Sequence, residues 1–144
     1  MAWLRTVVKL LLSILLACAL SSCQASDDAM GLDVTGYNHT DKDIGFFSVD
    51  GQGGSFVIRH GQGGFSCCVS IPSKYTTGMT VTVRWGGEEI GKTQERVVAV
   101  PPYRPEDGAI FAVHFLRDGE IKVFVTMYLL GYPKYPLKAD EAKL

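Results

Sequence analysis

Two adjacent cysteines, Cys67 and Cys68, are the residues of this chain with the clearest potential for redox or metal chemistry. Neighbouring side chains of a strand point to opposite faces, which predicts one thiol in the core and the other outside. A bond between them needs a strained ring, because the usual Cα separation in a disulfide is larger. The pattern leaves three alternatives open: buried structural thiols, a vicinal disulfide, or an intermolecular bond, metal site or nucleophile.

The three histidines, His39, His60 and His114, are isolated in the sequence, without the paired Cys/His spacing that is typical of zinc sites. His114 lies in an apolar run, which predicts a half-buried strand histidine. His39 lies in a turn-like segment whose polar side chains can satisfy backbone groups. We therefore expect no catalytic residue, no metal and no other cofactor.

Residues 86–93 match the phosphate-loop pattern letter for letter. A phosphate loop opens a helix, but residues 96–100 are mostly β-branched and two prolines follow them. Glu88 and Glu89 would also place two negative charges inside an anion site. The segment is therefore predicted to be a charged hairpin loop, and we expect no nucleotide.

Two runs of Gly-Gln-Gly-Gly, at 51–54 and 61–64, flank one predicted short strand. Glycines of this kind meet a need for positive φ or for close backbone packing. Alternatively, the two runs form a backbone-lined recognition loop that presents Arg59 and His60 to a partner.

A second candidate for partner binding is the tyrosine- and proline-rich stretch 128–136. Its Tyr128, Tyr132 and Tyr135 offer large, rigid contacts with a polar tip. The alternative is a tail that packs along the domain and takes no part in binding.

The elements that must position these residues are predicted to be strands. Eight short segments are rich in β-branched and aromatic residues and are bounded by glycine, proline, asparagine or aspartate. They are residues 34–37, 44–49, 56–60, 65–71, 80–85, 96–100, 110–116 and 121–128. This pattern predicts an all-β protein, a single antiparallel β-sandwich or small barrel-like domain.

The N-terminal segment has the three parts of a secretory leader. Arg5 and Lys9 supply positive charge, and an apolar core too short for a comfortable membrane span follows. Leu20-Ser21-Ser22-Cys23 then reads as a lipoprotein processing site, with lipid attached to Cys23. A rival site at Cys18 and an uncleaved anchor helix are the alternatives.

This interpretation divides the chain into a signal peptide at 1–22, an acylated cysteine and tether at 23–31, a β domain at 32–136 and a polar tail at 137–144. Removal of Arg5 and Lys9 leaves 12 basic residues against 15 acidic ones. Without a basic run, nucleic acid is not an expected partner. Gln24 in place of an aspartate favours the outer membrane, with the domain facing the periplasm.

Two motifs carry a resemblance to a known family: Tyr37-Asn38-His39-Thr40 and Cys67-Cys68-Val69. The resemblance continues through the predicted strands at residues 78–85 and 113–115. Over residues 32–136 the chain resembles the small proteobacterial lipoproteins catalogued as domain of unknown function 3304. The resemblance assigns no catalytic residue. It implies a genetic context beside type VI secretion toxins, including phospholipase effectors.

The expected function is therefore a membrane-anchored periplasmic binding protein without catalysis, an immunity-type protein that neutralises such a toxin. Its expected partners are the membrane, through the lipid, and the toxin protein. One alternative is an envelope thiol-redox or enzymatic module that uses Cys67 and Cys68, and another is a structural envelope lipoprotein.

Overall fold

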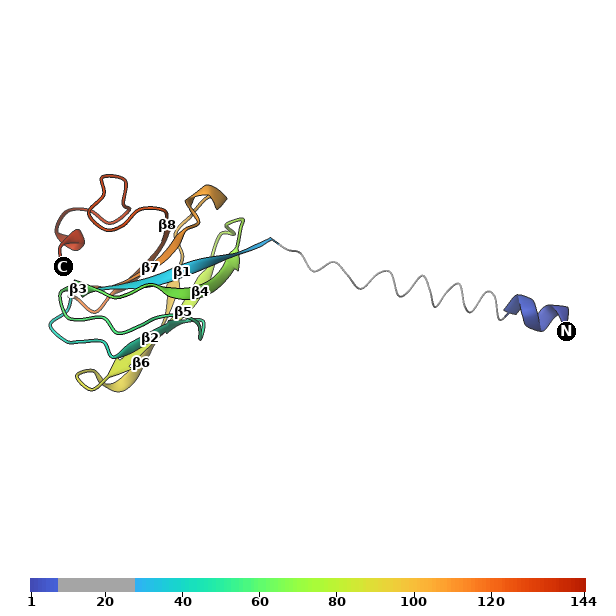
Figure 1. The fold of residues 1–144 in the computed structure, drawn as a ribbon, viewed down its shortest axis with the longest axis horizontal. Helices are drawn as coiled ribbons and strands as arrows, with labels where there is room; N and C mark the ends of the chain where they lie inside the picture. Colours follow the sequence, from blue (N-terminus) through green and yellow to red (C-terminus); the bar gives the residue numbers. More distant parts are fainter. Residues whose placement is uncertain (8–27) are drawn as a thin grey trace.

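The computed structural model describes residues 1–7 and 28–144 (Figure 1). Cys23 and the boundary after residue 22 lie outside the described residues. Residues 2–7 are helical, and none of the helices in the described ranges is both long and apolar enough to cross a membrane. The rest forms eight strands and two 3-10 helices, which are β1 (Ala29–Asn38), β2 (Phe46–Val49), β3 (Gly61–Gln62), β4 (Ser66–Pro72), β5 (Thr80–Gly87), β6 (Gly91–Ala99), η1 (Pro105–Asp107), β7 (Ile110–Phe115), β8 (Ile121–Thr126) and η2 (Ala139–Ala142).

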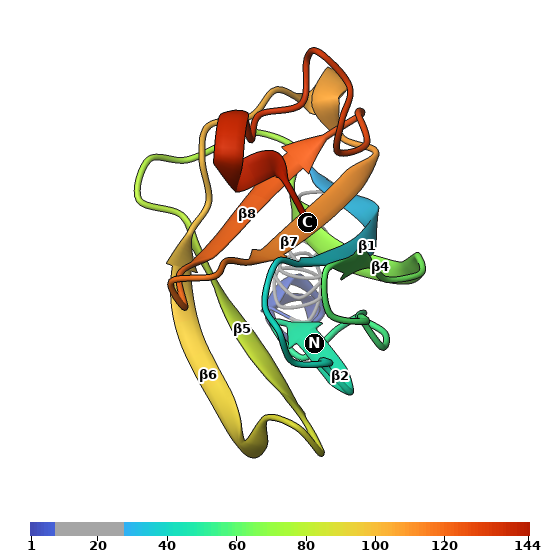
Figure 2. The same cartoon turned by 90° about the vertical axis from the view of Figure 1, so that its left-hand side faces the viewer.

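The strands form two sheets packed face to face, which confirms the predicted sandwich and excludes the closed barrel (Figure 2). One sheet has five strands in the order β3-β1-β7-β8, with β4 also paired to β1. The other has three strands in the order β2-β5-β6. Alternation along β5 shows why these segments are strands, because Val81 and Val83 are buried while Thr80 and Arg84 are exposed.

β1 is the central strand of the larger sheet. It pairs antiparallel with β3 and β4 on one side and parallel with β7 on the other. The parallel register sets Tyr37 opposite His114. All the other strand pairs in the described residues are antiparallel.

The five-stranded sheet is covered on one face by the other sheet, and on its second face where β7 and the end of β1 pass under the C-terminal segment. Between the sheets lies the main core, which includes Val34, Phe47, Val83 and Phe111, all buried. A smaller cluster forms on the opposite face under the C-terminal segment (Figure 2), and its buried members are Tyr37, Ala112, Leu116, Tyr135 and Leu137. The chain end therefore completes the fold.

The domain boundaries differ from the expected ones at both ends. β1 begins at Ala29, inside the segment expected to be a tether. At the other end, Leu137 is buried and η2 follows it, so residues 137–144 are docked on the sheet and form no free polar tail.

The prediction of a strand at residues 56–60 is wrong. Val57 forms only an isolated bridge with Ile44, and the N–H of Arg59 donates to the Asp43 carboxylate at 2.8 Å, where a strand would use a neighbouring backbone. The residues that do pair with β1 are Gly61 and Gln62, which were expected to form a turn. Residues 86–93 form the predicted hairpin, in which Gly87 pairs with Gly91.

Candidate functional site

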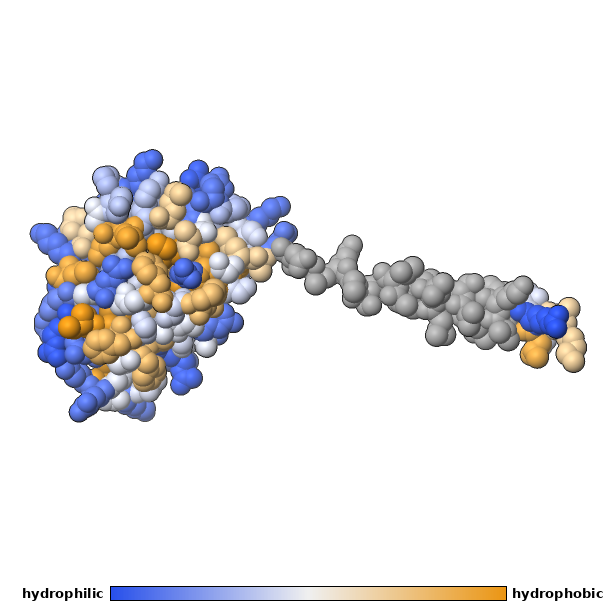
Figure 3. All heavy atoms as spheres, viewed as in Figure 1, coloured by the Kyte–Doolittle hydropathy of each residue, from blue (hydrophilic) through white to orange (hydrophobic). Residues whose placement is uncertain are grey.

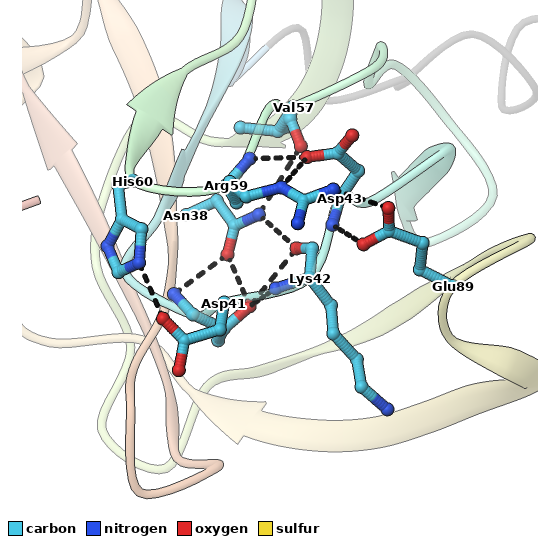
Figure 4. Close-up of polar contacts among 9 residues, drawn as sticks. Asn38, Asp41, Lys42, Asp43, Val57, Arg59, His60 and Glu89 are labelled. Carbon is cyan, nitrogen blue, oxygen red and sulfur yellow. Dashed lines mark hydrogen bonds and ion pairs between the residues drawn. The ribbon is translucent and has the colours of Figure 1, made fainter.

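Arg59 lies at the centre of a surface ion-pair cluster (Figure 4). Its Nε is 3.1 Å from Asp43 Oδ1, and its Nη2 bonds to Glu89 Oε1. The second oxygen of Glu89 accepts the N–H of Asp43 at 2.8 Å. These contacts hold the loop at residues 41–45 against the β5–β6 hairpin, and the guanidinium lowers the pKa of Asp43 through its hydrogen bonds.

The buried side chain of Asn38 fixes the loop from below. Its Nδ2 donates to the carbonyl oxygens of Lys42 and Val57, at 2.7 and 3.3 Å, and its Oδ1 accepts the N–H of Thr40 at 3.0 Å. These hydrogen bonds use backbone groups of the turn that follows β1, and they fix the direction in which the chain leaves the strand. His60 pairs with Asp41 at 2.7 Å on the outer side of the same loop (Figure 4).

Large exposed apolar side chains lie in the same stretch of the sequence as Asp43 and Arg59. Four of them, each about half exposed, come from the segment that contains both glycine-rich runs: Phe46, Phe56, Ile58 and Phe65. Phe56 lines a surface pocket with Asp43, Gly45, Glu88 and Glu89. Figure 3 shows hydrophobic side chains between hydrophilic ones on the face in view. We call these four side chains, together with Asp43, Arg59, His60 and Glu89, the loop surface.

The tyrosine stretch does not form one binding strip. Tyr135 is only 1% exposed, because it packs in the small core against Tyr37 and His114, so it is corrected from a partner contact to a core residue. Tyr128 is half-buried against the same cluster. Tyr132 alone of the three is largely exposed.

A chain of hydrogen bonds runs through the small core. Tyr135 Oη is 2.5 Å from His114 Nε2, His114 Nδ1 is 2.9 Å from His39 Nε2, and His39 Nδ1 is 2.7 Å from the Lys143 carbonyl oxygen. Tyr37 stacks on the His114 ring at 4.7 Å. Both histidines are fully buried. His114 is thus more deeply buried than expected, and His39 belongs to the core, although a turn position was expected.

The acceptor at the end of this chain determines the tautomers. A carbonyl oxygen only accepts, so His39 Nδ1 carries the proton and its Nε2 accepts from His114 Nδ1–H. His114 Nε2 then accepts the Tyr135 O–H. Both rings are neutral, which agrees with the pKa of His114, lowered to about 3 by burial and by the neighbouring His39. Burial likewise lowers the pKa of His39 and raises that of Tyr135.

These imidazoles are buried, and each of their ring nitrogens is hydrogen-bonded within the fold. A surface pocket of about 210 Å³ lies at the His39 end, lined also by Arg117 and Glu141. The ring nitrogen at that end is occupied by the Lys143 carbonyl, which Arg117 Nη2 also holds at 3.0 Å. The arrangement suits a role in anchoring the C-terminal segment.

Cys67 and Cys68 are joined in the structure as a vicinal disulfide across a cis peptide bond. Cys67 is exposed and Cys68 is half-buried, so neither thiol lies in the core. The expected split between inside and outside fails because both residues face the single residue Asp33 of β1 at a bulge.

Comparison with known proteins adds the family. A family model described as a protein of unknown function, DUF3304, matches residues 37–123. The chain belongs to this family. Neither a curated protein nor a solved structure matches the chain.

The DUF3304 match begins at the end of β1 and ends in β8. It contains the ion-pair cluster around Arg59, the cysteine pair and both buried histidines. Tyr135, which closes the hydrogen-bond chain, lies beyond the matched residues. The His39–His114 contact was missed in the sequence because 75 positions separate the two residues, and the parallel pairing of β1 with β7 that joins them has no local signal.

Proposed function

We propose that this chain is a non-enzymatic, membrane-anchored periplasmic binding protein of the immunity type, which neutralises a toxin by binding it. The loop surface is the observation that carries the proposal. Half-exposed Phe46, Phe56, Ile58 and Phe65, from the segment that also carries an arginine held by two carboxylates, have the composition of a protein interface centre. Exposed apolar side chains that gather beside polar ones often mark a site of interaction with another protein.

The frame beneath the loop surface supports binding without rearrangement. Phe47 and Val57, the buried neighbours of the exposed residues, are fully packed in the main core. Gly54 adopts positive φ, and a Cβ at this position would meet the Phe47 carbonyl group, so the glycine-rich turn is a packed structure. A surface ordered before contact loses little conformational entropy on binding.

The buried histidines support a binding role over a catalytic one. His39 and His114 are neutral and use every ring nitrogen within the fold. The compartment in this proposal comes from the leader expected at 1–22, with Cys23 as the lipidated residue. The toxin class, a phospholipase delivered by type VI secretion, comes from the context that the family resemblance implies.

The test is co-expression with the toxin encoded beside the gene, in a cell that the toxin kills from its periplasm. We expect survival and a stable complex of the two purified proteins. The double variant Phe56→Ala, Ile58→Ala is expected to weaken the complex at least about tenfold. Met127→Ala, an exposed apolar residue after β8, is the matched control and should bind as the wild type does. Unaltered killing together with no complex would overturn the proposal.

A further inference from the structure

The cysteine pair forms the wide side of a β-bulge. Leu32 of β1 pairs with Val69 of β4, and Val34 pairs with Ser66, so Cys67 and Cys68 together face Asp33. A bulge of this kind turns side chains in a direction that a regular ladder does not allow, and bulges are frequent next to functional sites. Here it directs two sulfur atoms and one carboxylate to the same place.

The neighbours of these residues hold them firmly. Leu32, Val34 and Val69 are fully buried in the main core, on the opposite face from Asp33. β1 is also paired with β7 at this level, where Asp33 is in register with Ile110. The carboxylate is therefore presented by a strand that is fixed on both sides.

The three groups form a ligand set for a cation. One oxygen of Asp33 and the sulfur atoms of Cys67 and Cys68 all lie within 4.8 Å of one another. Asp33 and Cys67 are exposed, and Gly31, the next residue of β1 on this side, has no side chain to cover Cys68. Within the described ranges, no basic side chain forms an ion pair with Asp33.

The charge of the site favours metal binding over a catalytic role in disulfide oxidoreduction. Reactive cysteines of disulfide oxidoreductases lie in electropositive surroundings. Here the adjacent group is an anionic carboxylate. Two thiolates and a carboxylate repel one another unless a cation lies between them, and cysteine sulfur with aspartate oxygen is a donor set that zinc accepts.

We infer that Asp33, Cys67 and Cys68 form a redox-gated site for a thiophilic divalent cation such as Zn²⁺ or Cd²⁺. In the oxidised chain the S–S bond keeps both sulfur atoms from binding a metal. A dithiol reductant supplies two electrons and two protons, the S–S bond breaks to give two thiols, and the reductant becomes its own disulfide. The cation then displaces both thiol protons to solvent, forms two metal–sulfur bonds and takes Asp33 as third ligand, with water in the open position.

The test titrates metal into the full chain in detergent, before and after reduction with a phosphine. We expect the reduced chain to bind one Cd²⁺ with the ultraviolet band of sulfur–cadmium charge transfer, and the oxidised chain to show no such band. The variant Cys67→Ser, Cys68→Ser keeps every other group of the chain that could bind the metal and so reports the background. A wild-type band no larger than that background overturns the inference.

The carboxylate has its own test, in which both cysteines are kept. Asp33→Asn should weaken Zn²⁺ binding to the reduced chain about tenfold or more, measured by competition with a chromogenic chelator. Asp28→Asn, an exposed aspartate just before β1, is the matched control and should leave the affinity unchanged. Equal affinity in Asp33→Asn and the wild type overturns the three-ligand site. Circular dichroism of each variant verifies that it is folded.

Discussion

His39 Nε2 and His114 Nδ1 lie 2.9 Å apart in the interior of the domain, in the middle of a hydrogen-bond chain from the Tyr135 hydroxyl to the Lys143 carbonyl. Each ring donates once and accepts once. The polar groups of a buried cluster are thereby fully satisfied, which is the condition under which such a cluster stabilises a fold. The two histidines connect β1, β7 and the C-terminal segment.

Replacing the central ring should destabilise the domain strongly. His114→Leu leaves the Tyr135 hydroxyl and His39 Nε2 buried without a partner, so we expect the free energy of unfolding to fall by about 2–4 kcal/mol. Urea unfolding measures it. His60→Ala, on the exposed loop, should change it by less than about 0.5 kcal/mol. Equal midpoints for His114→Leu and the wild type would contradict a structural role for the chain of hydrogen bonds.

Stability should fall in mild acid. Burial lowers the pKa of His114 from 6.5 to about 3 and also lowers that of His39. Below pH 6.5 the unfolded chain therefore binds protons that the folded chain does not, while above pH 6.5 both states are neutral and the full stability is present. The free energy of unfolding should decrease by up to about 1.4 kcal/mol per pH unit for each histidine.

Urea unfolding at about pH 7 and about pH 5 measures this dependence, in a range where most carboxylates remain ionised in both states. In His114→Leu the pH slope should be smaller, because one of the two titrating groups is gone. A flat profile for the wild type between these pH values would show that the histidines are accessible to protons in the folded state.

Two glycines of the first glycine-rich run should respond differently to the same substitution. Both have positive φ, but a Cβ at Gly54 would fall on the Phe47 carbonyl oxygen, whereas a Cβ at Gly51 meets no atom within 4 Å. We expect Gly51→Ala to cost about 1–2 kcal/mol from backbone conformation alone. Gly54→Ala should cost more than about 3 kcal/mol or prevent folding, since the backbone must move. Thermal unfolding of the pair distinguishes them, and similar melting temperatures would contradict the packing described for Gly54.

Arg59 should matter to binding and little to stability. Its ion pairs with Asp43 and Glu89 are exposed to solvent, so Arg59→Ala is expected to leave the urea midpoint of unfolding close to that of the wild type. If the loop surface contacts the toxin, the same variant should weaken the complex about tenfold or more, measured by calorimetry. Arg84→Ala, an exposed arginine paired with Glu95, is the control. Equal losses of affinity in both variants would locate the interface elsewhere.

The sequence predicts the strands that alternate cleanly and little of how they associate. Thr80–Gly87 lies where period-two alternation predicts a half-buried strand. Ile110–Phe115, which is buried on both faces, lies where its β-branched and aromatic composition predicts a strand. Residues 56–60 have the same composition but form no strand, since the side chains of Asn38 and Asp43 take backbone groups that a sheet would use. Competition of this kind depends on residues distant in sequence and cannot be read locally.

The sequence likewise predicts some of the candidate site residues but not the contacts that they make. Arg59 and His60 do lie together on an exposed loop, but the sequence does not indicate that Asp43, Glu89 and Asp41 are their partners. Tyrosine is a residue type typical of interfaces, yet Tyr135 is buried because His114 accepts the hydrogen bond of its hydroxyl in the core. Whether a tyrosine faces a partner or its own fold depends on tertiary contacts that composition does not contain.

The central place of β1 has a mechanical consequence. Because β1 is hydrogen-bonded to β4 on one edge and to β7 on the other, a pull on Ala29 acts along the strand and loads many bonds in shear at once. A pull across a terminal hairpin such as β7–β8 would open its bonds one after another. The domain is thus strongest against force from the side of residue 28, which is the direction in which an anchor at Cys23 would pull it.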